Sequence, residues 1–147
     1  MSKVFKIGIT KNNNQEIQEV KEIILFAGKG IVGDRYFHER NESRNQLTLI
    51  ESENIDYYNE KFNLKIPYLN FRRNIVTKGI KLNDLMGKKL IIEKTELRVI
   101  DLCRPCQVLQ KNLGQENIIK EFLRRGGLRC EILTSSSIKT GDEIKVK

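Results

Sequence analysis

The feature of this sequence that most limits its fold is a series of short apolar runs, each of which ends in a cluster of turn-forming residues. Several runs are rich in β-branched residues and alternate between apolar and polar positions, as half-buried strands do. They do not alternate with helices in the regular way of a parallel α/β sheet. The predicted strands lie at 4–9, 16–26, 45–50, the end of 70–77, 88–92, 97–101, 128–132 and 143–146. We therefore predict a mainly β protein, an antiparallel, barrel-like sheet with two or three short helices packed over its openings.

Helical spacing of apolar residues appears in only a few places. A short helix should follow Ser52, which is a suitable N-cap, and a second should lie within 116–125, where Gly126 can close it at C′. Residues 107–113 could form a third short helix. The first two strands should pair as a hairpin around a turn at 11–14.

Length and charge narrow the class of protein. The chain has 147 residues, which fits a single domain over 1–147 that buries about 68–70% of its unfolded surface. The net charge is +8, from 27 Lys and Arg against 19 Asp and Glu, and this favours an anionic partner: a phosphorylated small molecule, nucleic acid or a membrane surface. The basic residues are dispersed, so the sequence marks no nucleic-acid-binding tract and we do not expect nucleic acid as a partner.

The ends and the cysteines bear on the compartment. The N-terminus lacks the apolar core of a secretory signal, and the longest apolar run, 23–27, is too short to span a bilayer. Three cysteines, an odd number, agree with a reducing compartment. We expect a cytoplasmic protein with no membrane partner.

A pair of cysteines is the most reactive feature of the chain. Cys103 and Cys106 stand three apart around Arg104 and Pro105, directly after the predicted strand 97–101. A thiolate at such a turn is a nucleophile or a soft-metal ligand, and the adjacent arginine favours the ionised form.

The residues alone leave several hypotheses open for this pair. It could be a thiol–disulfide exchange site, although such sites belong to a βαβ context and the surroundings here are β-like. A zinc site would combine Cys103, Cys106, Cys130 and His38, but a second paired-ligand motif is missing, and strand alternation places Cys130 on one face with the apolar residues of 128–132. One thiolate could instead bind a metal whose other ligands come from a cofactor. Both cysteines could also be inert core residues.

A glycine-rich segment at 28–35 is a candidate anion site. It matches neither the dinucleotide-binding nor the phosphate-loop pattern, so a tight turn in which Asp34 caps a local amide is the simpler interpretation. Alternatively, backbone N–H groups and Arg35 face a phosphate.

The run Arg72-Arg73-Asn74 raises the same question. Arginines on a surface are usually solvated, but two guanidinium groups and an amide also offer forked donors suited to a phosphate and a polar heterocycle.

Taken in order, these motifs resemble those of a MOSC domain, the module at the C-terminus of molybdenum cofactor sulfurases, which also occurs alone in bacteria. The similarity covers the chain from about Val20 to Val146. The matching motifs are Gly33-Asp34-Arg35, Phe71-Arg72-Arg73-Asn74-Ile75-Val76, Leu82-Asn83-Asp84-Leu85-Met86-Gly87, Cys103-Arg104-Pro105-Cys106 and Arg125-Gly126-Gly127-Leu128-Arg129.

The resemblance implies a β-barrel-like fold that binds the molybdenum cofactor, a pyranopterin with a phosphate and a dithiolene. Cys106 falls where related proteins carry the cysteine that binds molybdenum or sulfur, so it is the implied catalytic residue and metal ligand. Arg35, Arg72 and Asn74 fall at cofactor contacts. The remaining candidates for cofactor binding are Gly33, Asp34, Arg73, Cys103 and Arg104.

Two activities follow from the resemblance. The protein could take part in molybdenum-dependent reduction of N-hydroxylated compounds, with electrons from a separate reductase, or it could carry sulfur or cofactor, with a cysteine desulfurase as partner. Pyridoxal phosphate is expected only in such a partner sulfurase. A thiol–disulfide oxidoreductase that uses the Cys-Arg-Pro-Cys pair is the alternative.

Overall fold

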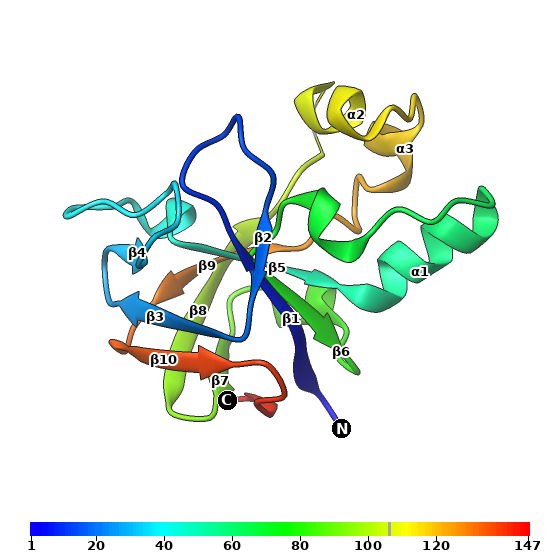
Figure 1. Cartoon of the computed structure of the whole chain (residues 1–147). Helices are drawn as coiled ribbons and strands as arrows, with labels where there is room; N and C mark the ends of the chain where they lie inside the picture. The colour runs from blue at the N-terminus through cyan, green and yellow to red at the C-terminus, as the bar shows by residue number, and fades with distance from the viewer. Residues whose placement is uncertain (106) are drawn as a thin grey trace.

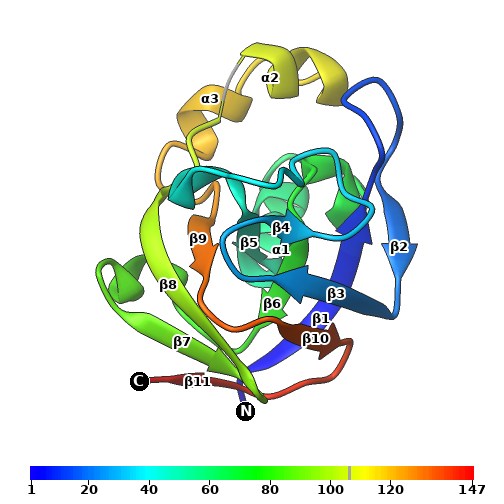
Figure 2. The same cartoon turned by 90° about the vertical axis from the view of Figure 1, so that its left-hand side faces the viewer.

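The computed structural model describes residues 1–105 and 107–147, and within them the chain is mainly β (Figures 1 and 2). The strands are β1 (Lys3–Ile9), β2 (Gln18–Val20), β3 (Glu22–Phe26), β4 (Gly30–Ile31), β5 (Leu47–Glu51), β6 (Ile75–Lys78), β7 (Lys89–Ile92), β8 (Thr95–Leu102), β9 (Leu128–Ile132), β10 (Ser136–Lys139) and β11 (Ile144–Val146). The α-helices are α1 (Ser52–Lys61), α2 (Gln107–Leu113) and α3 (Ile118–Glu121), and short 3-10 helices lie at Ser43–Asn45, Tyr68–Phe71 and Leu82–Leu85.

Eight strands form a curled sheet in the order β11-β7-β8-β9-β5-β6-β1-β2, and β10, β3 and β4 form a second, smaller sheet. Neighbours in the large sheet are antiparallel except for β5 and β6, which are parallel and are joined through α1. Figure 2 shows the large sheet curling around the small one like half of a barrel. The predicted mainly β, barrel-like fold with two or three short helices is therefore confirmed.

Both faces of the central strands are covered, because two apolar clusters lie on opposite sides of β5 and β6. Leu49 and Ile75 belong to the cluster inside the curl of the sheet. Their neighbours in sequence, Ile50 and Val76, belong to the cluster under the helices. Successive side chains of a strand point to opposite faces, so a strand covered on both faces is buried at consecutive positions, as β5 is from Leu47 to Ile50. This double burial makes β5 and β6 a rigid base for the loops at their ends.

The predicted strand 16–26 is in fact two strands in different sheets. β2 pairs with β1, with Ile7 opposite Val20. The predicted hairpin is therefore confirmed for the residues next to its turn, 7–9 and 18–20. After the exposed Lys21 the chain leaves this sheet, and β3 pairs with β10 and β4 instead. Alternation alone does not register this change of partner.

Two predicted helix ends are wrong. The helix α1 has Glu51 at its N-cap, and the hydroxyl of Ser52 contacts the Glu53 carboxylate at 3.3 Å instead of capping a backbone amide. The helix predicted within 116–125 is reduced to α3, which ends at Glu121 and continues in turns, so Gly126 is not its C′ residue. The helix α2, by contrast, has the bounds expected for the third helix.

Over 1–105 and 107–147, the structure contains no helix of the length and apolar character needed to cross a bilayer.

Candidate functional site

Three arginines that are far apart in the sequence gather at one end of the large sheet. Arg35, Arg72 and Arg73 line a hollow of about 290 Å³, together with Asn13, Tyr36, Leu109 and Asn112. The first follows β4, the next two precede β6, and Leu109 and Asn112 belong to α2. In both Figures 1 and 2, α2 and the loop between β1 and β2 lie side by side at this end. The helix that directly follows the cysteine pair thus forms one wall of the arginine-lined hollow.

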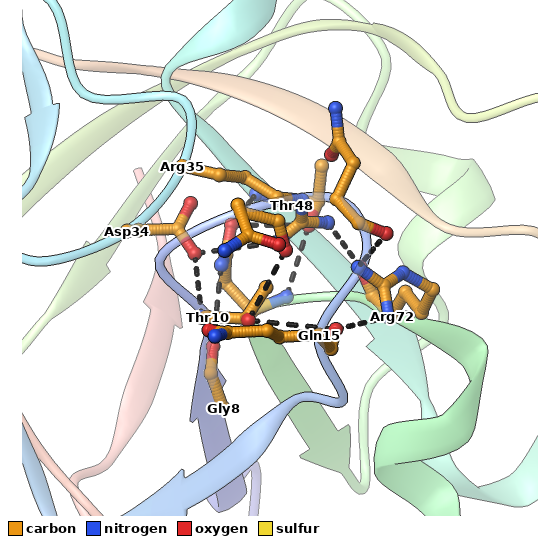
Figure 3. Close-up of polar contacts among 10 residues, drawn as sticks. Gly8, Thr10, Gln15, Asp34, Arg35, Thr48 and Arg72 are labelled. Atoms are coloured by element: carbon orange, nitrogen blue, oxygen red, sulfur yellow. Dashed lines mark hydrogen bonds and ion pairs between the residues drawn. The ribbon is translucent and has the colours of Figure 1, made fainter.

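Arg35 is held by a buried carboxylate. Its side chain is only 7% exposed, and Nη1 donates to Oδ1 of Asp34 at 3.2 Å while Nη2 donates to the carbonyl of Arg72 at 3.2 Å. Asp34 Oδ1 also accepts from the backbone N–H of Thr10 at 3.2 Å (Figure 3). Gly33 makes this turn possible, because its φ of 85° is one that only glycine adopts freely.

Two polar side-chain atoms of this turn lack a hydrogen-bond partner among the described residues. They are Arg35 Nε and Asp34 Oδ2, and both are buried. Buried polar atoms are nearly always paired, so each such atom calls for a partner beyond the chain or carries a cost in stability. The Nε–H of Arg35 is therefore an unpaired donor in the described structure, on a residue that lines the hollow.

Arg72 joins the hollow to the loop between β1 and β2. Its Nη1 and Nη2 donate to the carbonyls of Gln15 at 2.9 Å and Asn13 at 3.3 Å, and Figure 3 shows the first of these contacts. The backbone of Arg72 is left-handed, with φ 64°, which is uncommon outside glycine and marks a locally strained turn. Burial lowers the pKa of Arg72, and the positive charge of Arg35 lowers it further. An arginine nevertheless stays charged at neutral pH, so the two cations repel one another.

Arg73 connects the hollow to the cysteine segment. Its Nε donates to the carbonyl of Gly126 at 2.9 Å. Gly126 lies against the carbonyl of Cys103, where an added Cβ would approach to 2.5 Å. Burial raises the pKa of the Cys103 thiol, although Arg73 and Arg129 act in the opposite direction. Cys103 is thus a buried, protonated thiol behind the arginines.

Asn74 is 2% exposed and acts between strands rather than at the rim of the hollow. Its Oδ1 accepts from the backbone N–H of Thr48 at 3.1 Å and lies 3.2 Å from the Thr48 hydroxyl. Its Nδ2 donates to the carbonyl of Gly8 at 3.2 Å. These bonds tie the turn that carries Arg72 and Arg73 to β1 and β5.

The other candidate residues lie as follows. Cys106 is outside the described residues, Arg104 is exposed beside it in sequence, and Cys130 is fully buried in β9, on the face that strand alternation predicted. His38 is exposed in the turn after β4. Within 1–105 and 107–147 no three histidine, cysteine or acidic side chains gather as a metal site, so the described residues give the zinc hypothesis no support.

Sequence reasoning missed four residues that line the hollow: Asn13, Tyr36, Leu109 and Asn112. The ring centroid of Tyr36 lies 4.4 Å from Cζ of Arg35, so the two planar groups interact. The position of Tyr36 directly after Gly33-Asp34-Arg35 was the one available signal. The two asparagines and Leu109 gave none, because only long-range pairing brings their segments to the arginines.

The fold and the arginine cluster define a small curled β protein with an arginine-lined hollow at one end of its sheet. Comparison with protein families identifies which one: the model of the MOSC domain matches residues 31–145, and the chain belongs to the MOSC domain family. Members of this family are often linked to activity that depends on the molybdenum cofactor.

Solved structures agree with this fold. YuaD from Bacillus subtilis superposes with a TM-score of 0.82 at 19% identity, covering 99% of this chain and 96% of that one. YiiM from Geobacillus stearothermophilus gives 0.79 at 15% identity, with 100% and 75% covered, and YiiM from Escherichia coli gives 0.72 at 18%, with 99% and 68% covered. At these identities the likeness establishes the fold alone. Comparison with curated protein sequences gives no significant match.

Proposed function

We propose that this protein binds the molybdenum cofactor in the arginine-lined hollow. The observation that carries the proposal is the convergence of Arg35, Arg72 and Arg73 on one hollow whose opposite wall is α2, the helix directly after the cysteine pair. Membership of the MOSC family supports it independently.

The residues present fit such a group. The described residues that line the hollow include three guanidinium groups and no carboxylate, which suits a phosphate. The unpartnered Nε–H of Arg35 supplies a donor that no described group of the chain uses. The hollow is close to the lower end of the range of about 300–1,000 Å³ for small-molecule sites, and a second hollow adjoins it through Asn13, Arg72 and Asn112.

The candidate residues then take different roles. Arg35, Arg72 and Arg73 bind the phosphate, and Gly33, Asp34 and Asn74 hold these arginines in place. Cys106 provides the thiolate that binds molybdenum or carries a sulfur atom, and Arg104 beside it favours ionisation. Cys103 lies behind the arginines as a buried thiol, and its raised pKa argues against a role as a second nucleophile.

The bound cofactor would supply two-electron redox chemistry, which suits reduction of N-hydroxylated compounds with electrons from a separate reductase. In the carrier version of the proposal, the same thiolate accepts sulfur from a cysteine desulfurase and passes it on. We further propose that residues 1–147 act as one domain in the cytoplasm.

The test is the molybdenum and pterin content of protein purified from a cofactor-competent host, compared among wild type, Cys106→Ser and Cys103→Ala. We expect metal in the wild type and in Cys103→Ala, and loss of metal in Cys106→Ser. Absence of metal and pterin from all three would refute the proposal. Loss of activity in both single variants, with a reversible disulfide in the wild type, would favour the thiol oxidoreductase instead.

Enzyme and carrier are separated by two further measurements on the same wild-type protein. Mass spectrometry after incubation with a cysteine desulfurase detects a persulfide, and an assay with an N-hydroxylated compound detects turnover. Turnover without persulfide excludes the carrier role.

A further inference from the structure

A second hollow of about 360 Å³ adjoins the arginine-lined one. It lies between the loop that joins β1 to β2, the 3-10 helix Tyr68–Phe71 and the last turn of α2. Asn13, Arg72 and Asn112 line both hollows. A molecule in the second hollow would therefore lie directly beside one in the first.

The second hollow differs from the first in chemical character. Five of its ten lining residues carry carboxamides, namely Asn13, Asn14, Gln15, Asn70 and Asn112. Among the described residues that line it, Glu16 and Arg72 are the charged ones, and their charges balance. Both terminal nitrogens of Arg72 already donate to backbone carbonyls of the loop. A carboxamide both donates and accepts hydrogen bonds, whereas a guanidinium only donates. The second hollow thus suits an uncharged polar ligand, while the first suits an anion.

The apolar floor of this hollow depends on a missing side chain. Gly8 in β1 has an ordinary backbone conformation, but an added Cβ would lie 2.3 Å from Cγ2 of Ile17 and 2.9 Å from Cδ2 of Leu69. Both residues line the hollow. Glycine at this position leaves room for Ile17 and Leu69 to pack closely over the strand, where both contribute apolar lining to the hollow.

We propose that this amide-lined hollow is a binding subsite for a small, planar, uncharged molecule that presents an N–H donor next to a C=O or ring-nitrogen acceptor. Side-chain carboxamides pair with such edges through two parallel hydrogen bonds, as they do with adenine. Ile17, Leu69 and Leu113 offer apolar contact to the ligand plane. The idea that this ligand is the reacting molecule rests on the proposed cofactor site next to the hollow. The idea that the hollow binds such a ligand does not depend on the cofactor site.

The experiment titrates isotopically labelled full-length protein with three probes and follows side-chain N–H signals by NMR. Benzamide has the required edge, benzoate has nearly the same shape but carries a charge and no donor, and inorganic phosphate probes the arginines. We expect benzamide to shift the side-chain amide signals of Asn70 and Asn112 more than benzoate does. Phosphate should shift the Nε–H signals of Arg35 and Arg73.

Two variants test ligand binding to each hollow separately. Asn70 lines only the amide-lined hollow, is exposed, and should tolerate change to Leu without loss of folding. Asn70→Leu should weaken benzamide binding roughly 3- to 10-fold, the loss expected for one hydrogen bond, and leave phosphate binding unchanged. Arg73 lines only the arginine-lined hollow, and Arg73→Gln should do the reverse. Asn45→Leu, which changes an exposed asparagine elsewhere, should alter neither.

The outcomes distinguish the two proposals. The subsite is refuted if benzamide leaves the Asn70 and Asn112 signals in place, if benzoate shifts them equally, or if Asn70→Leu binds benzamide as the wild type does. Failure of phosphate to shift the arginine signals would count against the cofactor site alone, because the benzamide result does not depend on it.

Discussion

Asn74 offers the sharpest test of how the arginines are held, because its resemblance-based role and its geometry point in different directions. The resemblance implies a cofactor contact. In the structure its side chain is almost fully buried and bonded to the backbone of β5 and to that of β1. Replacement by Ala would leave the N–H of Thr48 and the carbonyl of Gly8 without this partner.

The size of the effect follows from those two groups. A buried donor or acceptor that loses its partner costs about 1–3 kcal/mol. For the two together we expect Asn74→Ala to lower the free energy of unfolding by about 2–6 kcal/mol, which is large for a single substitution. In a domain of this size the melting temperature should fall by roughly 5–15 °C.

The assay is urea unfolding followed by circular dichroism, with phosphate affinity measured well below the unfolding midpoint. Asn74→Ala should shift the midpoint with little change in slope. The control Asn45→Ala removes an exposed carboxamide and should stay within about 0.5 kcal/mol of wild type.

The result that would refute this reasoning is an Asn74→Ala variant as stable as wild type that no longer binds phosphate. Asn74 would then be a ligand contact, and the hydrogen bonds to Thr48 and Gly8 would be dispensable. Loss of stability with phosphate affinity retained supports the bracing role.

Three further predictions concern the backbone, the buried thiols and the anion site. Gly127 has φ 100°, and a Cβ there would lie 1.8 Å from the carbonyl oxygen of Leu49. Gly127→Ala should therefore lower the free energy of unfolding in urea by about 3 kcal/mol or more. The control Gly141→Ala, with φ 95° and open space around it, should lower it by about 1–2 kcal/mol. Burial raises the pKa of the Cys103 and Cys130 thiols above the ordinary 9.0, so the unfolded chain loses these protons first. Stability should therefore fall as pH rises past that value, by up to about 1.4 kcal/mol per pH unit for each thiol, and the urea midpoint of Cys130→Ala should depend less steeply on pH. Arg35→Lys keeps the charge but loses the forked donors, so phosphate affinity measured by calorimetry should fall about tenfold; an unchanged affinity would mean that charge alone suffices.

The parts of the fold that sequence reasoning predicted are those that a local pattern specifies. The strand β9 has the predicted bounds, because alternation from Leu128 to Ile132 marks one buried face. The strand β10, with the sequence Ser-Ser-Ile-Lys, has one buried apolar residue and was missed. Its partner β3 specifies it through the pairing of Ile138 with Ile23, more than 100 residues away. Short strands of this kind are defined by what they pair with and carry little signal of their own.

The candidate site follows the same division. Arginine beside glycine, and two arginines in a polar turn, could be recognised from residue type. The position of Asn13 and Asn112 beside them could not be predicted. It depends on the pairing of β1 with β6 and on the contact of α2 with the 3-10 helix Tyr68–Phe71.

The arginines lie in unfavourable local environments, and this costs free energy of folding that a bound ligand can offset. Arg35 is a nearly buried cation with an unpartnered N–H in the described structure, Arg72 has a left-handed backbone, and the charge of one lowers the pKa of the other. Each of these features disfavours the folded state in isolation. An anion between the guanidinium groups would reverse the repulsion and pair the free donor, so the same contacts that bind it would stabilise the fold. Sites at which sequence, backbone and charge disagree in this way are the ones where function is expected, and here they coincide with the hollow beside α2.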